Sequence, residues 1–109
     1  MKTDEHRIQV AIVRYLRIMG VMVFAVPNGG KRDAKTGAYL KDEGALAGVA
    51  DLIILLPNRC VFIEVKTYKG DQQQTQKDFE QRVKGLGYEY YVWRSLDDAI
   101  EFTKTKPND

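Results

Sequence analysis

Two apolar segments near the middle of the chain carry three charged residues at positions where a small domain needs hydrophobic ones. The segments are DLIILL (51–56) and VFIEVK (61–66), and the charges are Asp51, Glu64 and Lys66. Both segments have the length and the β-branched content of strands, and the short turn between them predicts a hairpin. Burying a charge is costly unless it is paired or bound. The three charges are therefore the feature that any fold of this chain has to accommodate.

The register of the predicted hairpin decides whether these charges meet. DLIILL is apolar at every position after Asp51, which predicts a central strand buried on both faces. A turn with two unpaired residues places Asp51 opposite Glu64, and a turn with four places Asp51 opposite Lys66. Either register gathers the three side chains on one face of the sheet, whereas a three-residue turn separates them.

Composition limits the chain to one domain. Its 109 residues are 44% hydrophobic and 29% charged, which is typical of a single globular unit, and we predict one domain over residues 1–109 with a frayed tail at 103–109. A net charge of +2 by itself predicts neither nucleic-acid nor membrane binding. Cys60 is the only cysteine, and there is no membrane-length apolar run or signal-peptide pattern. We therefore expect a cytoplasmic protein, in a bacterium or a phage-infected host cell, with no membrane partner.

The remaining patterns predict an α/β fold in the order α-β-β-β-α-β-α, with a short mixed sheet flanked by helices. The first helix is capped by Thr3 or Asp4 and ends before Gly20. Further elements are a strand over 21–26, the two hairpin strands, a helix after Gln74, a strand over 88–93 and a helix from Ser95 to Phe102. The segment between Pro27 and Gly48 is predicted to be a long loop.

The three charges predict a metal site. Two carboxylates held about 4 Å apart repel by about 4 kcal/mol at an effective dielectric constant near 20, and one lysine can neutralise only one of them. Carboxylate oxygens without histidine or cysteine ligands suit Mg²⁺, or Mn²⁺ as a substitute. Lys66 would then hold or activate an attacking water. The alternative is a surface-facing strand on which Glu64 and Lys66 are merely solvated and Asp51 is a turn residue.

These residues also carry a resemblance to a known family. Asp51, twelve intervening residues and then Glu64-Val65-Lys66 resemble the core of the PD-(D/E)XK nucleases, with Ala50 in place of a proline. The chain from Thr3 to Ser95 is similar to one branch, the VRR-NUC domains. The shared features are Glu5 and Gln9 in an early helix, Pro27-Asn28-Gly29 after a strand, the segment 44–52, Ile63 before the motif, Gly70, a helix that begins with glutamines, and Gly87-Tyr88.

The resemblance implies roles for particular residues. Glu5, Asp51 and Glu64 would ligate the metal, the Val65 carbonyl would add a further oxygen, and Lys66 would be the catalytic lysine. The family also places a glutamine that supports the active site, and Gln76 occupies that position.

Periodicity agrees with two of these assignments. Glu5 lies three residues before Ile8 and shares the core-facing stripe of its helix, and Gln76 lies three residues before Phe79. The alternative for both is an ordinary polar residue in the first turn of a helix.

The function implied by the resemblance is Mg²⁺-dependent, structure-specific cleavage of branched DNA, at four-way (Holliday) junctions, by a homodimer. Flap or replication-fork cleavage is an alternative, as is a non-catalytic DNA-binding or docking module on a nuclease fold. Lys31, Arg32 and Lys35 are expected to contact DNA phosphates, with Asn28 beside the site. A solvated loop is the alternative for these basic residues.

Overall fold

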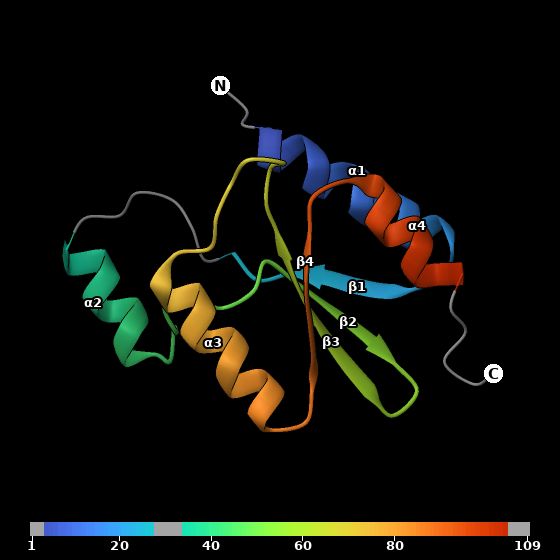
Figure 1. Cartoon of the computed structure of the whole chain (residues 1–109). Coiled ribbons are helices and arrows are strands. Elements are labelled where there is room, and N and C mark those ends of the chain that lie inside the picture. The colour runs from blue at the N-terminus through green and yellow to red at the C-terminus, as the bar shows by residue number, and fades with distance from the viewer. Residues whose placement is uncertain (1–3, 28–33, 105–109) are drawn as a thin grey trace.

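The structure is a computed structural model that describes residues 4–27 and 34–104. Four helices and four strands follow one another along the chain (Figure 1). They are α1 (Asp4–Ile18), β1 (Met22–Ala25), α2 (Ala34–Asp42), β2 (Leu52–Leu56), β3 (Arg59–Val65), α3 (Gln74–Gly85), β4 (Glu89–Trp93) and α4 (Leu96–Lys104). The predicted α/β fold is confirmed, with one additional helix, α2.

The strands form one mixed sheet in the order β1-β2-β3-β4. β1, β2 and β3 pair antiparallel, whereas β3 and β4 pair parallel and are connected through α3. α1 and α4 lie together over one face of the sheet, and α3 lies on the other face beside β4 (Figure 1). The strands β1 and β4 are therefore the two edges of the sheet.

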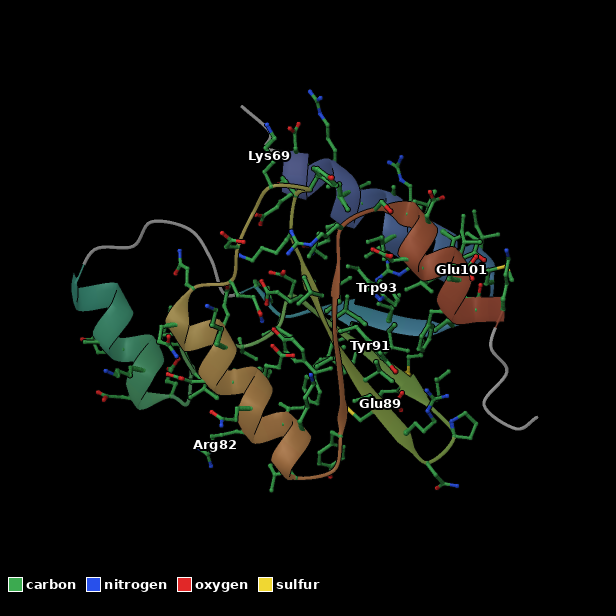
Figure 2. All side chains as sticks on the ribbon, viewed as in Figure 1. Lys69, Arg82, Glu89, Tyr91, Trp93 and Glu101 are labelled. Carbon is green, nitrogen blue, oxygen red and sulfur yellow. The ribbon has the colours of Figure 1, made fainter. Side chains whose placement is uncertain are left out.

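The larger core lies between the sheet and the pair α1 and α4. Its buried members are Ile12, Leu16, Val23, Leu52, Ile54, Val61, Ile63, Val65, Trp93 and Ala99. Trp93 and Tyr91 both place their rings against Phe102 of α4, with centroids 5.5 and 6.1 Å apart (Figure 2). A smaller cluster on the opposite face joins Phe62 to Phe79 of α3. These two cores fix both helical layers relative to the strands.

The hairpin between β2 and β3 has a two-residue turn. Leu56 pairs with Arg59, which leaves only Pro57 and Asn58 unpaired, and Asn58 adopts a φ of 60°. Asparagine tolerates this left-handed conformation better than most residues. β3 thus begins two residues earlier than predicted, and the register that places Asp51 opposite Glu64 is the one that forms.

β2 is not buried on both faces, contrary to the prediction. The side chain of Leu55 is 38% exposed, and its neighbours on β1, Met22 and Phe24, are 61% and 39% exposed. The reason is that α3 packs beside β4 and leaves the β1 side of the same face uncovered. A continuous apolar run therefore did not indicate two covered faces here.

The segment predicted to be a long loop contains the helix α2. One glycine inside a helix costs about 1 kcal/mol relative to alanine, and Gly37 lies among good helix formers such as Leu40 and Lys41. Beyond α2, Gly44 has a φ of 107° and ends the helical path. The glycines and mixed charges of this segment favoured a loop in the prediction, although residues 34–42 form a helix.

α4 extends two residues further than predicted, to Lys104. The hydroxyl groups of Thr103 and Tyr15 lie 2.6 Å apart and are hydrogen-bonded, which ties the end of α4 to α1. Residues 103 and 104 therefore belong to α4 and not to a frayed tail, and residues 105–109 lie outside the described part of the chain. Within the described part, none of the helices is both long and apolar enough to cross a bilayer.

We predict that Gly48→Ala destabilises the fold more than any other glycine substitution tested. Gly48 has a φ of 82°, and a Cβ atom there would lie 2.1 Å from the Thr75 carbonyl oxygen at the start of α3. Gly85→Ala is the matched control, because a Cβ at that helical position meets no atom within 4 Å. Urea denaturation should show a loss for Gly48→Ala and a gain of about 0.5–1 kcal/mol for Gly85→Ala. Equal stability of the two variants would contradict the close approach.

Candidate metal and catalytic site

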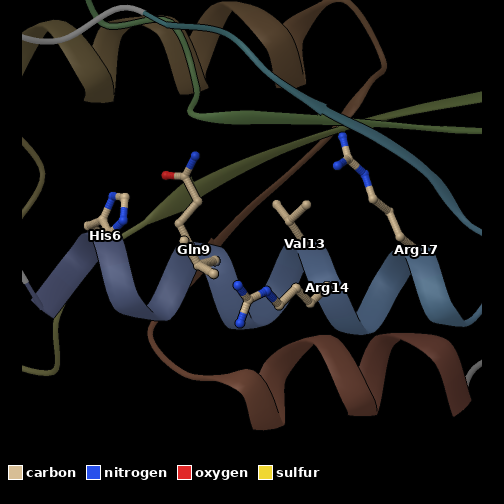
Figure 3. A pocket seen from close by; sticks show the side chains of 6 residues that line it. His6, Gln9, Val13, Arg14 and Arg17 are labelled. Atoms are coloured by element: carbon tan, nitrogen blue, oxygen red, sulfur yellow. The ribbon is translucent and has the colours of Figure 1, made fainter.

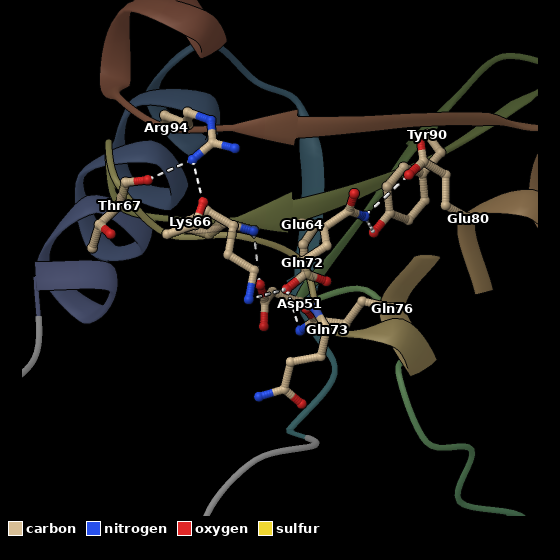
Figure 4. Close-up of polar contacts among 12 residues, drawn as sticks. Asp51, Glu64, Lys66, Thr67, Gln72, Gln73, Gln76, Glu80, Tyr90 and Arg94 are labelled. Carbon is tan, nitrogen blue, oxygen red and sulfur yellow. Dashed lines mark hydrogen bonds and ion pairs between the residues drawn. The ribbon is translucent and has the colours of Figure 1, made fainter. Parts of the chain in front are cut away.

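Asp51, Glu64 and Lys66 meet where β2 begins and β3 ends. The Val65 backbone N–H donates to Asp51 Oδ2 at 2.7 Å, which holds Asp51 across the strand pair from Glu64. Lys66 Nζ lies 3.8 Å from Glu64 Oε2 (Figure 4). Glu64 is 1% exposed and Lys66 is 7% exposed. The hairpin thus brings the three charges together, as its register predicts, with Glu64 and Lys66 buried and Asp51 half-buried.

Gln76 connects Glu64 to the first turn of α3. Its Nε2 donates to Glu64 Oε2 at 2.9 Å, and its Oε1 accepts a hydrogen bond from the backbone N–H of Gln73 at 2.8 Å. The second contact satisfies one of the N–H groups at the start of the helix and fixes the side chain at the same time. Gln76 therefore orients the Glu64 carboxylate from the end of α3, which places it where the sequence predicted a supporting glutamine.

Glu64 is held in an environment that disfavours its charge. Burial is the main cause that raises its pKa, and the negative charge of Asp51 and a hydrogen bond to Asp51 raise it further, to about 8. Lys66 opposes this shift, and Glu5 adds to it. Glu64 Oε1 is buried and makes no hydrogen bond within the described chain. An unpaired buried carboxylate oxygen is rare and costly, which marks Glu64 as a binding group.

The donor set suits Mg²⁺. This ion binds through one or two carboxylates and keeps several waters, and Asp51 and Glu64 supply two carboxylates, one of them with an unpaired oxygen. No three His, Cys, Asp or Glu side chains form a ready-made cage among the described residues. Glu5 lies half-buried in the first turn of α1, close enough for its charge to act on Glu64. Glu5 and the Val65 carbonyl stay predicted ligands.

Arg94 fixes the turn that follows Lys66, a role that the sequence analysis missed. Its Nη1 donates to the carbonyl oxygens of Thr67 and Gly70 at 2.7 and 2.6 Å (Figure 4). The Lys66 backbone N–H donates to the Trp93 carbonyl. The end of β4 and the residue after it therefore hold the chain both at Lys66 and in the turn that follows. Nothing in the sequence pairs an arginine after one strand with a turn after another. Only the parallel pairing of β3 with β4 brings them together.

A second polar group that the sequence analysis missed lies beside the site. Gln72 Nε2 donates to Glu80 Oε1 at 3.0 Å and to the Tyr90 hydroxyl at 3.1 Å. Burial, and then the charge of Glu64, raise the pKa of Tyr90, so its hydroxyl stays protonated. The contacts tie the loop before α3 to both α3 and β4. Tyr90 belongs to an aromatic strand pattern, which hid its polar role.

The predicted DNA contacts lie mostly outside the described residues. Asn28, Lys31 and Arg32 fall within 28–33, and Lys35 lies in the first turn of α2, where only the backbone is described. These four residues therefore stay predicted DNA contacts.

Solved structures with this fold carry the name of the family that the sequence resembles. One, named "VRR_NUC domain protein", aligns over 95% of this chain and 88% of its own with a TM-score of 0.76 and 20% identity. Another, named "VRR_NUC domain", aligns over 94% of this chain and 97% of its own with a TM-score of 0.68 and 20% identity. No family model matches the sequence, and no curated protein does. The chain therefore has the nuclease-like fold of VRR_NUC domains, and the predicted fold resemblance is confirmed.

We predict that the metal-free protein loses stability as the pH rises and that Glu64 causes the loss. The folded protein keeps a proton on Glu64 up to about pH 8, whereas the ordinary pKa of a glutamate is 4.5. Stability is therefore greatest below the lower value and falls as the pH passes through the higher one. Melting temperatures measured in a chelator between pH 5.5 and 9 should fall more steeply for the wild type than for Glu64→Gln. At pH 9 the variant should be the more stable protein.

Glu80→Gln is the control for this measurement, because the pKa of Glu80 is lowered by its contacts with Lys84 and Gln72. Replacing this group should not flatten the pH dependence above pH 5.5. Parallel curves for the wild type and Glu64→Gln would show that Glu64 is ionised in the folded protein throughout this range.

Proposed function

We propose that this protein is a metal-dependent endonuclease that hydrolyses phosphodiester bonds in branched DNA. The observation that carries the proposal is the Glu64 carboxylate, whose Oε1 is buried without a hydrogen-bond partner among residues 4–27 and 34–104. The same carboxylate lies beside Asp51 and 3.8 Å from the Lys66 ammonium. A stable core has no use for two mutually repelling carboxylates, whereas a phosphate-cleaving metal site requires them. The VRR_NUC fold supports the same class of chemistry.

Asp51 and Glu64, with Glu5 and the Val65 carbonyl, would hold Mg²⁺, and Mn²⁺ would substitute for it. When bound, such an ion lowers the pKa of a coordinated water and offsets charge on a scissile phosphate. Gln76 and Lys66 both contact Glu64 Oε2, so the hydrogen bond from Gln76 restrains the carboxylate against rotating toward Lys66. The protein thus holds the two carboxyl groups in fixed positions for a metal ion.

Lys66 would orient the attacking water for in-line displacement at phosphorus. Lys66 is buried, the turn that follows it is held by Arg94, and its ammonium carries only hydrogen-bond donors. A donor in this position can hydrogen-bond to a water or to a phosphate oxygen while Glu64 limits its movement. Burial also strengthens its attraction to phosphate, because water screens the charge less.

The first test of this proposal compares cleavage by single-site variants. Asp51→Asn and Glu64→Gln should lower Mg²⁺-dependent cleavage of branched DNA by roughly a hundredfold or more, because each removes a metal-binding charge. Lys66→Gln should lower cleavage to a similar extent. Asp97→Asn changes an exposed acid on α4 and is the matched control, which should cleave like the wild type. Rates from denaturing gels under single-turnover conditions measure the effect.

A separate binding measurement distinguishes the roles. Mn²⁺ should raise the melting temperature of the wild type and of Lys66→Gln but not of Glu64→Gln. Full activity in either carboxylate variant contradicts the site. DNA binding by a wild type that never cleaves supports the docking-module alternative, and preference for flaps or forks over four-way junctions supports the other alternative.

We also propose that the active species is a symmetric homodimer. A four-way junction has approximate two-fold symmetry, which two equivalent sites would match. The open face of β1 and β2 exposes Met22, Phe24 and Leu55 side by side, and contiguous exposed apolar side chains mark interaction surfaces. This surface favours the β1 edge over β4, whose Tyr91 and Trp93 pack on α4. A second copy that pairs at this surface would cover the apolar face that α3 leaves open.

The dimer proposal predicts that Met22→Glu/Phe24→Glu yields monomers. Sedimentation of the wild type at micromolar concentration should give about twice the 12.5 kDa chain mass, and the double variant should give one chain mass. Tyr39→Glu removes an exposed aromatic residue from α2, away from the sheet, and should stay dimeric. A monomeric wild type would contradict the proposal.

A further inference from the structure

We propose that one flank of α1 is a binding track for the DNA backbone, formed by Arg14 and Arg17 and leading away from the metal and catalytic site. The inference rests on the proposed function, since it assigns the same DNA a path across the protein. It adds contacts to those expected between residues 28 and 35, because α1 and α2 lie apart in the fold (Figure 1).

The first support is the charge distribution along α1. Both acids of this helix, Asp4 and Glu5, lie in its first turn, and residues 6–18 contain no Asp or Glu. Arg7 and Arg14 are exposed and form no ion pair with any described residue. Helices that only face solvent usually mix both signs of charge, which is not the case here. The helix therefore has one anionic end at the metal and catalytic site and a cationic body.

The second support is a hollow along the same flank. It has a volume of about 320 Å³, and its lining residues are His6, Gln9, Val10, Val13, Arg14 and Arg17. Figure 3 shows Gln9, Val13 and Arg17 on the side of α1 that faces the strands. Gln9 lies one helical turn after Glu5, so the hollow begins beside the metal and catalytic site. Its valines could contact the sugars of a DNA strand, and its arginines could bind the phosphates.

The third support is the fixed position of Arg17. Its Nη2 donates to the Val23 carbonyl of the edge strand β1 at 3.4 Å. A guanidinium carries five N–H donors, so this long contact leaves the others available for a phosphate, which arginine binds through two parallel hydrogen bonds. A side chain held in this way loses less conformational freedom on binding. Arg17 is thus preorganised on the rim of the hollow.

The spacing agrees with a continuous path. The rise of 1.5 Å per helical residue places Arg14 about 13.5 Å and Arg17 about 18 Å beyond Glu5 along the axis of α1. A DNA backbone segment that follows α1 would therefore meet both arginines within about 18 Å of Glu5 along the helix axis. Contacts at this distance from the metal and catalytic site would fix the cleavage position relative to a branch in the DNA.

The test compares two double variants that each remove two positive charges. Arg14→Gln/Arg17→Gln alters the track, and Arg82→Gln/Lys84→Gln alters the last turn of α3, where Arg82 points away from α1 (Figure 2). Binding to fluorescent branched DNA is measured by anisotropy in a chelator, from 50 to 200 mM salt. The track variant should bind roughly tenfold more weakly, and its plot of log affinity against log salt should be shallower by about 1.8. The α3 variant should match the wild type.

Arg14→Gln alone tests the track without the Arg17 contact to β1, because Arg14 is exposed and forms no ion pair with any described residue. It should reduce the salt slope by about 0.9 at an unchanged melting temperature. An unchanged slope in both track variants overturns the track, as does an equal loss in the α3 variant. Binding is measured without divalent cations and so does not depend on cleavage. A wild type that does not cleave would contradict the proposed function, but the binding data would still test the track.

Discussion

The site depends on the register of the β2–β3 hairpin. Because Pro57 and Asn58 alone form the turn, Asp51 and Glu64 lie opposite each other, and the Val65 N–H can bind Asp51. A slip of one residue would send Glu64 to the face that holds the larger hydrophobic core. The apolar alternation of β3 opposes that slip, since it would remove Ile63 from the larger core and put the Glu64 carboxyl group among apolar side chains. The same hydrophobic pattern that stabilises the sheet therefore fixes the geometry of the site.

Glu64 shows how the fold tolerates a group that weakens it. Gln76 and Lys66 compensate one oxygen of the carboxylate, and the other oxygen has no partner in the described chain. Departures from good packing of this kind concentrate at functional sites. The surroundings are correspondingly rigid: Arg94 holds the turn after Lys66, and Gly48 lets the chain before Asp51 pass close to the start of α3. These contacts around the site thus hold the buried Glu64 carboxyl group in place although its burial is unfavourable.

Under the proposed function, α1 would link the metal site at one end to DNA recognition along its length. Its apolar stripe, through Ile12 and Leu16, anchors it to the sheet and so determines where Glu5 and the cationic flank lie. A helix anchored in this way moves as one body with the strands. A phosphate bound at Arg14 would consequently sit at a fixed distance from Glu64. That rigid connection is what would convert affinity for the DNA backbone into a defined cleavage position.

The sequence by itself determined the strands and the helices α1, α3 and α4, because hydrophobic periodicity assigns each side chain to a face. It left the hairpin register open between two turn lengths that group Asp51, Glu64 and Lys66 and a three-residue turn that separates them, and the structure shows a two-residue turn. It concealed α2, where Gly37 interrupts a helical pattern, and it overstated the burial of β2. Only the tertiary structure decided which faces α3 covers, and only the parallel pairing of β3 with β4 brought Arg94 to the turn after Lys66. Such contacts join residues far apart in the chain, and local patterns carry no information about them.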